Sequence, residues 1–279
     1  PLTALDADAR WEGMLADDIT TDNNMDFTVT LRDVQWSDGE PVTADDVIWT
    51  MLKISSPEVA NPSFDFSSFK GFDENGQSPS GAESIEGIEK KDDRTVVFHA
   101  QRTLSLISFI NNICTWIPIL PSHALADIPA SELSSSDWFN HPTVTDGPYI
   151  LDSYDAAHYI SYHANDKYSF GAPKISKLNI RIVNASELLA GLQNGDIDVV
   201  LPNIGIMPDS DLASAEALEN VEVSYSAPVT NQMTFFNTRS LTDARVRQAI
   251  VYAIDRQNLV NGLLSGHGEV GEGFCEPVL

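Results

Sequence analysis

Residues 27–47 have the sequence FTVTLRDVQWSDGEPVTADDV. The first five alternate apolar and polar side chains, which is the two-residue period of a β-strand with one buried face. The Ser37-Asp-Gly39 segment that follows is typical of a turn. Thr43 is a good helix N-cap, and Asp46 three residues later completes the pattern of a capping box. The stretch therefore predicts a strand, a turn and a helix, in that order.

The residues downstream predict more strands and helices. Alternating or β-branched runs indicate two strands joined by a turn within 85–100, a hairpin within 149–162, and strands at 178–183, 196–201, 221–225 and 232–236. Apolar stripes and capping residues indicate helices at 104–113, 186–194, 242–254 and 256–264. We expect Gly195 to end the second of these helices. The strand, helix and strand over 178–201 would then form a βαβ-like unit.

Residues 55–82 have the composition of a loop, with several Pro, Gly and Ser, but they also carry aromatic side chains. Phe64 and Phe66 are two of these. Aromatic residues in a polar loop either line a pocket or anchor the loop to the core, and anchoring is the more ordinary role.

The chain is strongly acidic. Its 41 Asp and Glu oppose 16 Lys and Arg, which gives a net charge of −25 over 279 residues. Such a surface repels nucleic acid and anionic lipid, so neither is expected as a partner. The acids are spread along the chain, which favours a protein from a high-salt environment, where screening shortens the repulsion. An ordinary acidic protein from a moderate environment is the alternative interpretation.

Residues that would carry catalysis are missing or scattered. The sequence contains no phosphate-binding loop, no Gly-x-Ser-x-Gly nucleophile elbow and no His-Glu-x-x-His helix. His158 and His163 are five residues apart, which puts them on opposite faces of a strand and argues against a shared metal. Cys114 and Cys275 are too few for a metal site or a disulfide framework, although they could pair with each other or with another cysteine. We therefore predict no catalytic residues, no cofactor and no metal.

Taken together, the motifs resemble family 5 of the extracellular solute-binding proteins, the peptide- and nickel-binding type. In that family a strand ending in Leu-Arg is followed by an aromatic residue, an Asp-Gly turn and Thr-Ala-Asp-Val at the start of a helix. This chain has Leu31-Arg32, Trp36, Asp38-Gly39 and Thr43-Ala-Asp-Asp-Val47 at the same places. The joint match over residues 27–47 makes the resemblance specific.

Later blocks resemble the same family in the same order. They are Ile117-Pro-Ile-Leu-Pro-Ser-His123, Gly147-Pro-Tyr149 with Asn165-Asp-Lys-Tyr168, Leu192-Gln-Asn-Gly-Asp-Ile-Asp-Val199, and Phe236-Asn-Thr238 with Val246-Arg-Gln-Ala249 and Ala253-Ile-Asp-Arg256. One departure is Ser169-Phe170, where the family often has Trp. Family members are also much longer, so we expect this chain to be a fragment without the lobe that closes on the ligand.

The resemblance implies an α/β (α+β) fold with the periplasmic-binding-protein-like class II (cluster C) architecture, incomplete at both ends. It implies family domain II, a small α+β domain, at 1–143, the main part of the α/β domain I at 144–244, and the hinge with the start of a truncated domain III at 245–279. Family members enclose a solute between lobes that close about a hinge. No covalent step is implied, so the chain is not expected to be an enzyme.

The function implied by the resemblance is that of the extracytoplasmic solute-binding component of an ABC importer. It would bind di- or oligopeptides, or a nickel complex, between its lobes and deliver them to the permease in the membrane. We expect a monomer of a halophilic archaeon at the extracellular face of the membrane, lipid-anchored in the full-length protein. A peptide-sensing receptor module without transport is the alternative, and a hydrolase is a third class that no motif supports.

The resemblance also nominates ligand-binding residues. Asn231, Gln232 and Met233 fall where family members present a strand that faces the cleft, although a plain solvent-facing strand is the alternative. Phe64 and Phe66 are further candidates on the loop of the second domain, with anchoring as the alternative. In the family, the acid that meets the peptide amino terminus lies in the later lobe.

Overall fold

The computed structural model describes residues 1–6, 10–59, 64–200, 209–225, 233–264, 266 and 268–271. The chain divides into two compact units, Pro1–Arg181 and Ile182–Leu279. This division differs from the domain limits expected at 143 and 244, and the three-domain assignment stays a prediction. The mixed α and β fold class is confirmed by the elements of both units.

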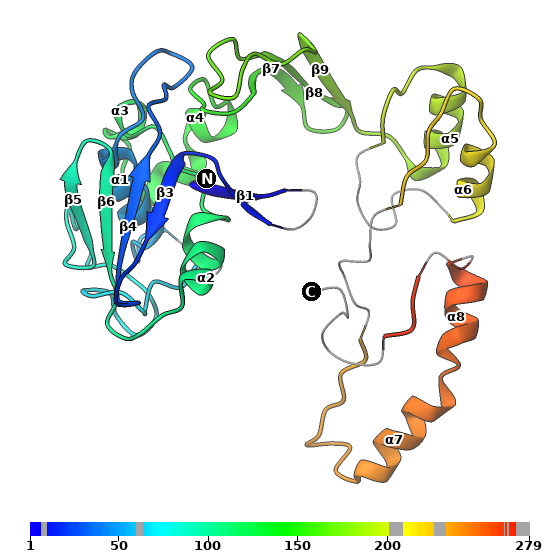
Figure 1. The fold of residues 1–279 in the computed structure, drawn as a ribbon. Coiled ribbons are helices and arrows are strands. Elements are labelled where there is room, and N and C mark those ends of the chain that lie inside the picture. The colour runs from blue at the N-terminus through cyan, green and yellow to red at the C-terminus, as the bar shows by residue number, and fades with distance from the viewer. Residues whose placement is uncertain are drawn as a thin grey trace. The chain divides into compact units, whose positions relative to one another are not determined.

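The first unit is built on an antiparallel sheet with the strand order β3-β4-β6-β5 (Figure 1). Its strands are β3 (Ala16–Thr20), β4 (Asp26–Leu31), β5 (Ile88–Asp92) and β6 (Thr95–His99). The strand predicted at 27–31 and the pair predicted within 85–100 are thus confirmed. Phe27 lies opposite Phe98, and Val29 lies opposite Val96. All four side chains are fully buried, so the alternating pattern marks the face of the sheet that forms the core.

Helix α1 (Ala44–Ile54) begins where the capping box predicted it. Thr43 is the N-cap, and its backbone N–H donates to the carboxylate of Asp46 at 2.8 Å. The same buried carboxylate accepts from Trp36 Nε1 at 3.3 Å and from the backbone N–H and Oγ of Ser122 at 2.8 and 2.7 Å. Asp46 therefore ties the turn, the start of the helix and residue 122 together, which is a structural role for a charged residue.

The helix predicted at 104–113 is present but changes its pitch part-way. Helix α2 (Leu106–Phe109) continues directly into a π-helical turn, Ile110–Cys114. Phe109 stacks on Phe27 with 4.5 Å between ring centroids and meets Phe98 edge-on at 5.2 Å. Cys114 is a buried free thiol, and Cys275 lies outside the described residues.

Shorter elements complete the first unit. They are β1 (Thr3–Leu5) and β2 (Trp11–Gly13), α3 (Ser122–Leu125), a 3₁₀ turn (Ala130–Ser135), α4 (Asp137–Asn140), and a second sheet of β7 (Tyr149–Asp155), β8 (Tyr159–Ala164) and β9 (Lys177–Arg181). This sheet is antiparallel in the order β7-β8-β9. The predicted hairpin within 149–162 and the predicted strand at 178–183 are both confirmed.

The described part of the second unit is helical. Its helices are α5 (Ala185–Asn194), α6 (Asp209–Glu216), α7 (Ala244–Ala253) and α8 (Arg256–Leu263). Gly195 ends α5 with φ of +76°, a backbone conformation that suits glycine. The N-cap of α7 is Asp243, one residue after the predicted Thr242, because its side chain accepts from the N–H of Arg245. Asp255 caps α8 as predicted.

Three predicted strands of this unit are wrong. The described residues of 196–201, 221–225 and 232–236 belong to no strand, so no βαβ-like unit forms there. Leu201 and Gln232 lie outside the described residues. A strand exists only when a neighbouring strand takes its hydrogen bonds, and within the described residues none pairs with these segments. Val199, expected inside a buried strand, is 71% exposed.

Candidate ligand-binding site

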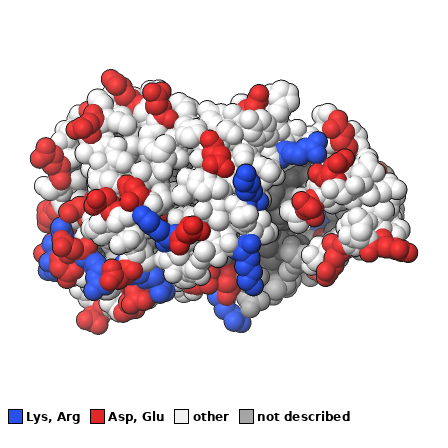
Figure 2. Space-filling view, turned by 90° about the horizontal axis from the view of Figure 1, so that it is seen from above, with Lys and Arg blue, Asp and Glu red and all other residues white. Residues whose placement is uncertain are grey.

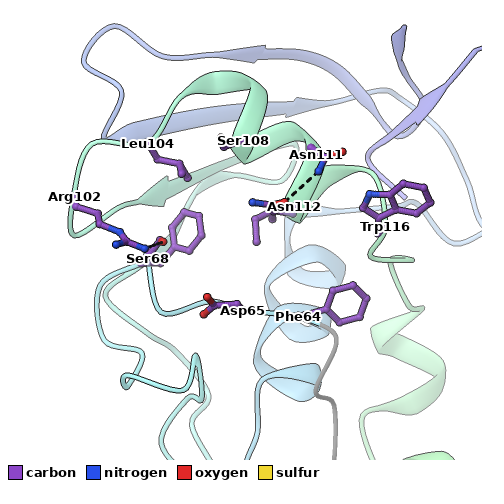
Figure 3. A pocket seen from close by; sticks show the side chains of 11 residues that line it. Phe64, Asp65, Ser68, Arg102, Leu104, Ser108, Asn111, Asn112 and Trp116 are labelled. Atoms are coloured by element: carbon purple, nitrogen blue, oxygen red, sulfur yellow. Dashed lines mark hydrogen bonds between the residues drawn. The ribbon is translucent and has the colours of Figure 1, made fainter. Parts of the chain in front are cut away.

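A pocket of about 690 Å³ opens beside α2 and the π-helical turn in the first unit (Figure 3). One wall comes from the segment that precedes β5, and the other from residues that follow β6. The lining residues are Phe64, Asp65, Ser68, Phe69, Arg102, Leu104, Ser108, Asn111, Asn112, Ile113 and Trp116.

The wall at residues 64–69 is held by hydrogen bonds between side chains and the backbone. Asp65 Oδ1 accepts from the N–H of Ser67 at 2.8 Å, which closes a tight turn. Gln101 Nε2 donates to the carbonyl of Phe69 at 2.8 Å and so fixes the turn to the end of β6. Gly76 approaches this turn closely, and a Cβ there would lie 2.5 Å from the backbone nitrogen of Phe66. A side chain at position 76 would therefore push the wall out of place.

The opposite wall is made by α2 and the π-helical turn. Ser108, Asn112 and Trp116 recur every four residues, so they lie along one side of the helical stretch. Asn111 Nδ2 donates to Asn112 Oδ1 at 3.2 Å, the contact drawn in Figure 3. The wider turn is closed by Thr115, whose backbone N–H donates to the carbonyl of Ile110 at 3.1 Å. Turns of this kind are frequent at functional sites.

The two ends of the pocket differ in chemistry. Arg102 and Ser68 lie at one end, where the guanidinium donates to Ser68 Oγ at 3.1 Å, and Phe64 and Trp116 lie toward the other (Figure 3). Hydrogen bonds from Ser67, reinforced by the positive charge of Arg102, hold the pKa of the Asp65 carboxyl below its ordinary value. Asp65 is thus ionised at neutral pH. The indole of Trp116 is 60% exposed and available to a ligand.

These residue types suit binding rather than catalysis. The amide side chains of Asn111 and Asn112 can both donate and accept hydrogen bonds, which matches a peptide backbone or another amide. The aromatic end offers apolar area to a side chain. The volume lies in the range of small-ligand pockets. The described lining includes one carboxylate and two Ser hydroxyls, which add hydrogen-bonding groups for a ligand.

Of the ligand-binding residues predicted from the sequence, the structure places one at the pocket. Phe64 lines the pocket. Phe66 is 1% exposed and stacks on Phe72 with 5.2 Å between centroids, which is the anchoring alternative. Met233 is 44% exposed in the second unit. Asn231 and Gln232 lie outside the described residues. Ligand binding by these residues stays a prediction.

Several pocket residues were not nominated from the sequence, namely Arg102, Asn111, Asn112 and Trp116. A signal for two of them was available. Asn111 and Asn112 interrupt the most apolar stretch of the chain, 104–120, and polar side chains inside such a run often face a cavity. For Arg102 we find no local signal, because its role depends on the segment that precedes β5.

Four histidines of the first unit form hydrogen bonds with neighbouring carboxylates, namely His99, His123, His158 and His163. His158 Nδ1 lies 2.9 Å from Asp155 Oδ1, and His163 Nδ1 lies 2.6 Å from Asp152 Oδ1. Within the described ranges, no group of three or more His, Cys, Asp or Glu has the geometry to hold a metal ion. No helix among the described residues is long and apolar enough to span a membrane.

Acidic side chains cover the molecular surface widely. Figure 2 shows Asp and Glu across the whole viewed face, whereas Lys and Arg are fewer and gather in a few places. This distribution agrees with the net charge of −25.

Comparison with known proteins connects this scaffold to a family. Residues 10–279 match the family model of bacterial extracellular solute-binding proteins, family 5 middle. The chain belongs to this family. The resemblance inferred from residues 27–47 and the later blocks is thereby confirmed, as is the periplasmic-binding-protein-like fold.

Individual relatives of this family 5 chain are oligopeptide- and metal-complex-binding proteins. The oligopeptide-binding protein AppA of Bacillus subtilis is 28% identical over 253 residues, which are 89% of this chain and 42% of AppA. The structure of AppA with a nonapeptide superposes with a TM-score of 0.75 at 25% identity, over 99% of this chain and 52% of that one. NikA of Brucella suis with Fe(III)-EDTA gives a TM-score of 0.81 at 15% identity, covering 99% of this chain and 52% of NikA, and shows the fold alone.

This family 5 chain spans about half the length of the relatives that it matches. Proteins of the family are extracellular or periplasmic solute-binding components of ABC importers, and the matched relatives are binding proteins rather than enzymes.

Proposed function

We propose that this chain is the solute-binding part of an ABC importer for di- or oligopeptides, and that the pocket at α2 contributes one wall of the peptide site. The observation that carries this proposal is the lining of that pocket, where two adjacent amide side chains lie between an aromatic end and an Arg end. An extended peptide needs this combination, with amides for its backbone, apolar area for a side chain and a cation for a carboxylate.

The relatives support a peptide as the first ligand to test. AppA is an oligopeptide-binding protein, and its structure holds a nonapeptide. A nickel complex is a second candidate ligand, because another structural neighbour is NikZ from Campylobacter jejuni in complex with Ni(L-His), a likeness of fold at 23% identity.

The rest of the proposal follows from the family role. The loaded protein would close about a hinge, with domain limits near 143 and 244, and deliver its peptide to a membrane permease. It would act at the extracellular face of the membrane, held there by a lipid anchor. The charge of −25 favours a monomer, because two copies repel each other, and it favours a high-salt habitat.

A peptide titration of the 279-residue chain tests the binding step. We expect a nonapeptide to shift the indole N–H resonance of Trp116, and Trp116→Ala to weaken binding by about tenfold, since a buried aromatic contact contributes about 1–2 kcal/mol. The matched control is Trp11→Ala, which removes another exposed Trp, 38% exposed on β2, and should leave the affinity unchanged. No binding of any di-, tri- or nonapeptide, or equal losses for both variants, would contradict the proposal.

A further inference from the structure

Helix α1 carries apolar side chains on more than one face. Val47 and Met51 are fully buried in the core of the first unit. Ile48 and Trp49 are half-buried and line a second pocket of about 650 Å³. A helix that is apolar around most of its circumference is normally covered on every side. Ile48 packs partly against the core, whereas Trp49 is half-buried and is not among the side chains packed on it, so the role of Trp49 calls for an explanation beyond folding.

This second pocket is formed by α1, residues 78–83 and the stretch from α3 to residue 130. None of its lining residues lines the pocket at α2, so the two are separate cavities of the same unit. Its apolar surface comes from Trp49, Leu52, Pro79, Ala82, Ala126 and Pro129. Such a lining, in a cavity of this volume, is typical of a small-molecule site.

Carboxylates lie among the lining residues. Asp45 pairs with Lys90, whose Nζ lies 2.7 Å from the Asp45 carboxylate and 3.0 Å from that of Asp93. Glu58 and Glu83 remain, against the one ammonium of Lys53. Ser80 Oγ donates to Glu58 at 2.7 Å, which holds this carboxylate in position. The local balance of charge therefore favours a cationic ligand.

The aromatic face in the pocket already accommodates an ammonium group. Lys53 Nζ lies over the ring of Trp49, 5.2 Å from its centroid. A cation at this distance is attracted by the electron-rich face of the indole. The side chain of Lys53 is long and flexible, so a ligand cation can take its place while Lys53 turns outward to solvent.

We propose that this pocket is a second ligand site, which binds a small organic cation consisting of an ammonium or guanidinium group on an apolar body. The cation would lie over Trp49 in place of the Lys53 ammonium, with Glu58 and Glu83 as counter-charges and the apolar body against Leu52 and Ala82. A second copy of the chain is a poor occupant of the pocket, because its net charge of −25 is repelled by the carboxylates of Glu58 and Glu83. The inference does not depend on the proposed peptide function.

Titration with phenethylammonium, followed by NMR, tests this site directly. We expect the indole N–H resonance of Trp49 to shift while that of Trp116 stays in place, and we expect the neutral analogue 2-phenylethanol to bind at least about threefold more weakly. Equal binding of the alcohol, or shifts confined to Trp116, would overturn the proposal. Because the peptide titration is read at Trp116, failure of one site is distinguishable from failure of the other.

Three variants test separately the indole of Trp49, the competing ammonium of Lys53 and the carboxylate of Glu83. Trp49→Leu should weaken phenethylammonium binding about tenfold, whereas Lys53→Met should strengthen it about threefold, because the internal competitor is gone. Glu83→Gln should weaken binding, but Glu86→Gln, an identical charge change outside the pocket, should not. Both glutamates are exposed, so these two variants remain informative even if Trp49→Leu does not fold. Weaker binding by Lys53→Met, or equal effects of the two glutamine variants, would overturn the assignment.

Discussion

Helices α1 and α7 are of similar length and have similar sequence patterns, but their surroundings are opposite. α1 runs for 11 residues and buries Val47 and Met51 completely. α7 runs for 10 residues and carries Val246 and Ile250 on an apolar stripe that the C-cap Ile254 follows, and each of the three is at least 37% exposed. Both helices begin at a capping side chain, so their starts are encoded equally well.

The difference shows what a helical pattern does and does not determine. Periodicity and caps predict that a segment is helical, since both act within a few residues. They do not determine what packs on the apolar stripe. For α1 the partner is a sheet whose strands lie on both sides of it in the sequence. For α7 no described residue buries the stripe.

The largest loss of stability is expected from a substitution in the core of the first unit. Phe109→Ala should lower the free energy of unfolding by about 3–5 kcal/mol, because the fully buried ring leaves a cavity between Phe27 and Phe98. All five Trp residues lie in the first unit, so Trp fluorescence during urea unfolding reports on that unit alone. A loss below about 1 kcal/mol would show that the ring is not packed as described.

The next largest contrast in stability is expected between the carboxylates of Asp46 and Asp255, which lie at the starts of α1 and α8. Asp46→Ala should cost about 2–4 kcal/mol, because it leaves buried donors of Thr43, Trp36 and Ser122 without their acceptor. Asp255→Ala on α8 removes an exposed cap and should cost about 1 kcal/mol. Urea unfolding followed by Trp fluorescence measures the first, and helical circular dichroism measures the second. Equal costs would remove the distinction between the buried and the exposed cap.

A smaller effect is expected from pH. The hydrogen bond from His99 Nδ1, 2.7 Å from Asp26 Oδ1, together with one from Asn23, holds the pKa of the Asp26 carboxyl below its ordinary value of 3.8. Because the folded state then binds fewer protons, this stabilisation is complete above pH 3.8 and is lost as the pH falls through the lowered pKa. The stability difference between the natural chain and Asp26→Asn should therefore shrink as the pH falls below 3.8.

Asp243 offers the matched pH test in the second unit. Hydrogen bonding from Arg245 lowers the pKa of the Asp243 carboxyl, so Asp243→Asn has the same sign of pH dependence. The stability change caused by Asp243→Asn should be visible in unfolding followed by circular dichroism but not by Trp fluorescence, because the Trp residues report only on the first unit. A pH-independent difference for Asp26→Asn would contradict the role given to His99.

The smallest effect is expected on the exposed stripe of α7. Ile250→Ala should change the unfolding free energy by less than about 0.5 kcal/mol, since the side chain is already 37% exposed and touches no core. The counterpart in α1 is Met51→Ala, which should cost about 2–5 kcal/mol. A large loss for Ile250→Ala would show that a further segment of the protein covers the stripe.

Much of the fold was predictable because its signals are local. The alternation of Phe27 to Leu31 and the capping box at Thr43 each predicted an element that the structure contains. Gly195 likewise predicted the end of α5. The strands expected at 196–201 and 221–225 were wrong, because the composition of a strand says nothing about whether a neighbouring strand is available.

The site was less predictable than the fold. Phe64 and Phe66 are two residues apart and chemically identical, but the first lines the pocket and the second is an anchor in the core. Their difference depends on the turn closed by Asp65 and on Gly76, which comes ten positions after Phe66. Asn111, Asn112 and Trp116 come together through the π-helical turn, whose extra residue leaves no clear signature in the sequence.

The π-helical turn also bears on how this pocket tolerates insertions and deletions. Loss of one residue within 110–114 would restore the ordinary α-helical repeat, and the residues after it would keep nearly the same direction relative to α2, because a π-helical turn holds about one residue more than an α-helical turn. Trp116 would then remain at the cavity, whereas gain of one residue that continues the α-helix would rotate Trp116 away from it by about 100°. The aromatic end of the pocket thus depends on the number of residues in this turn as well as on their identity.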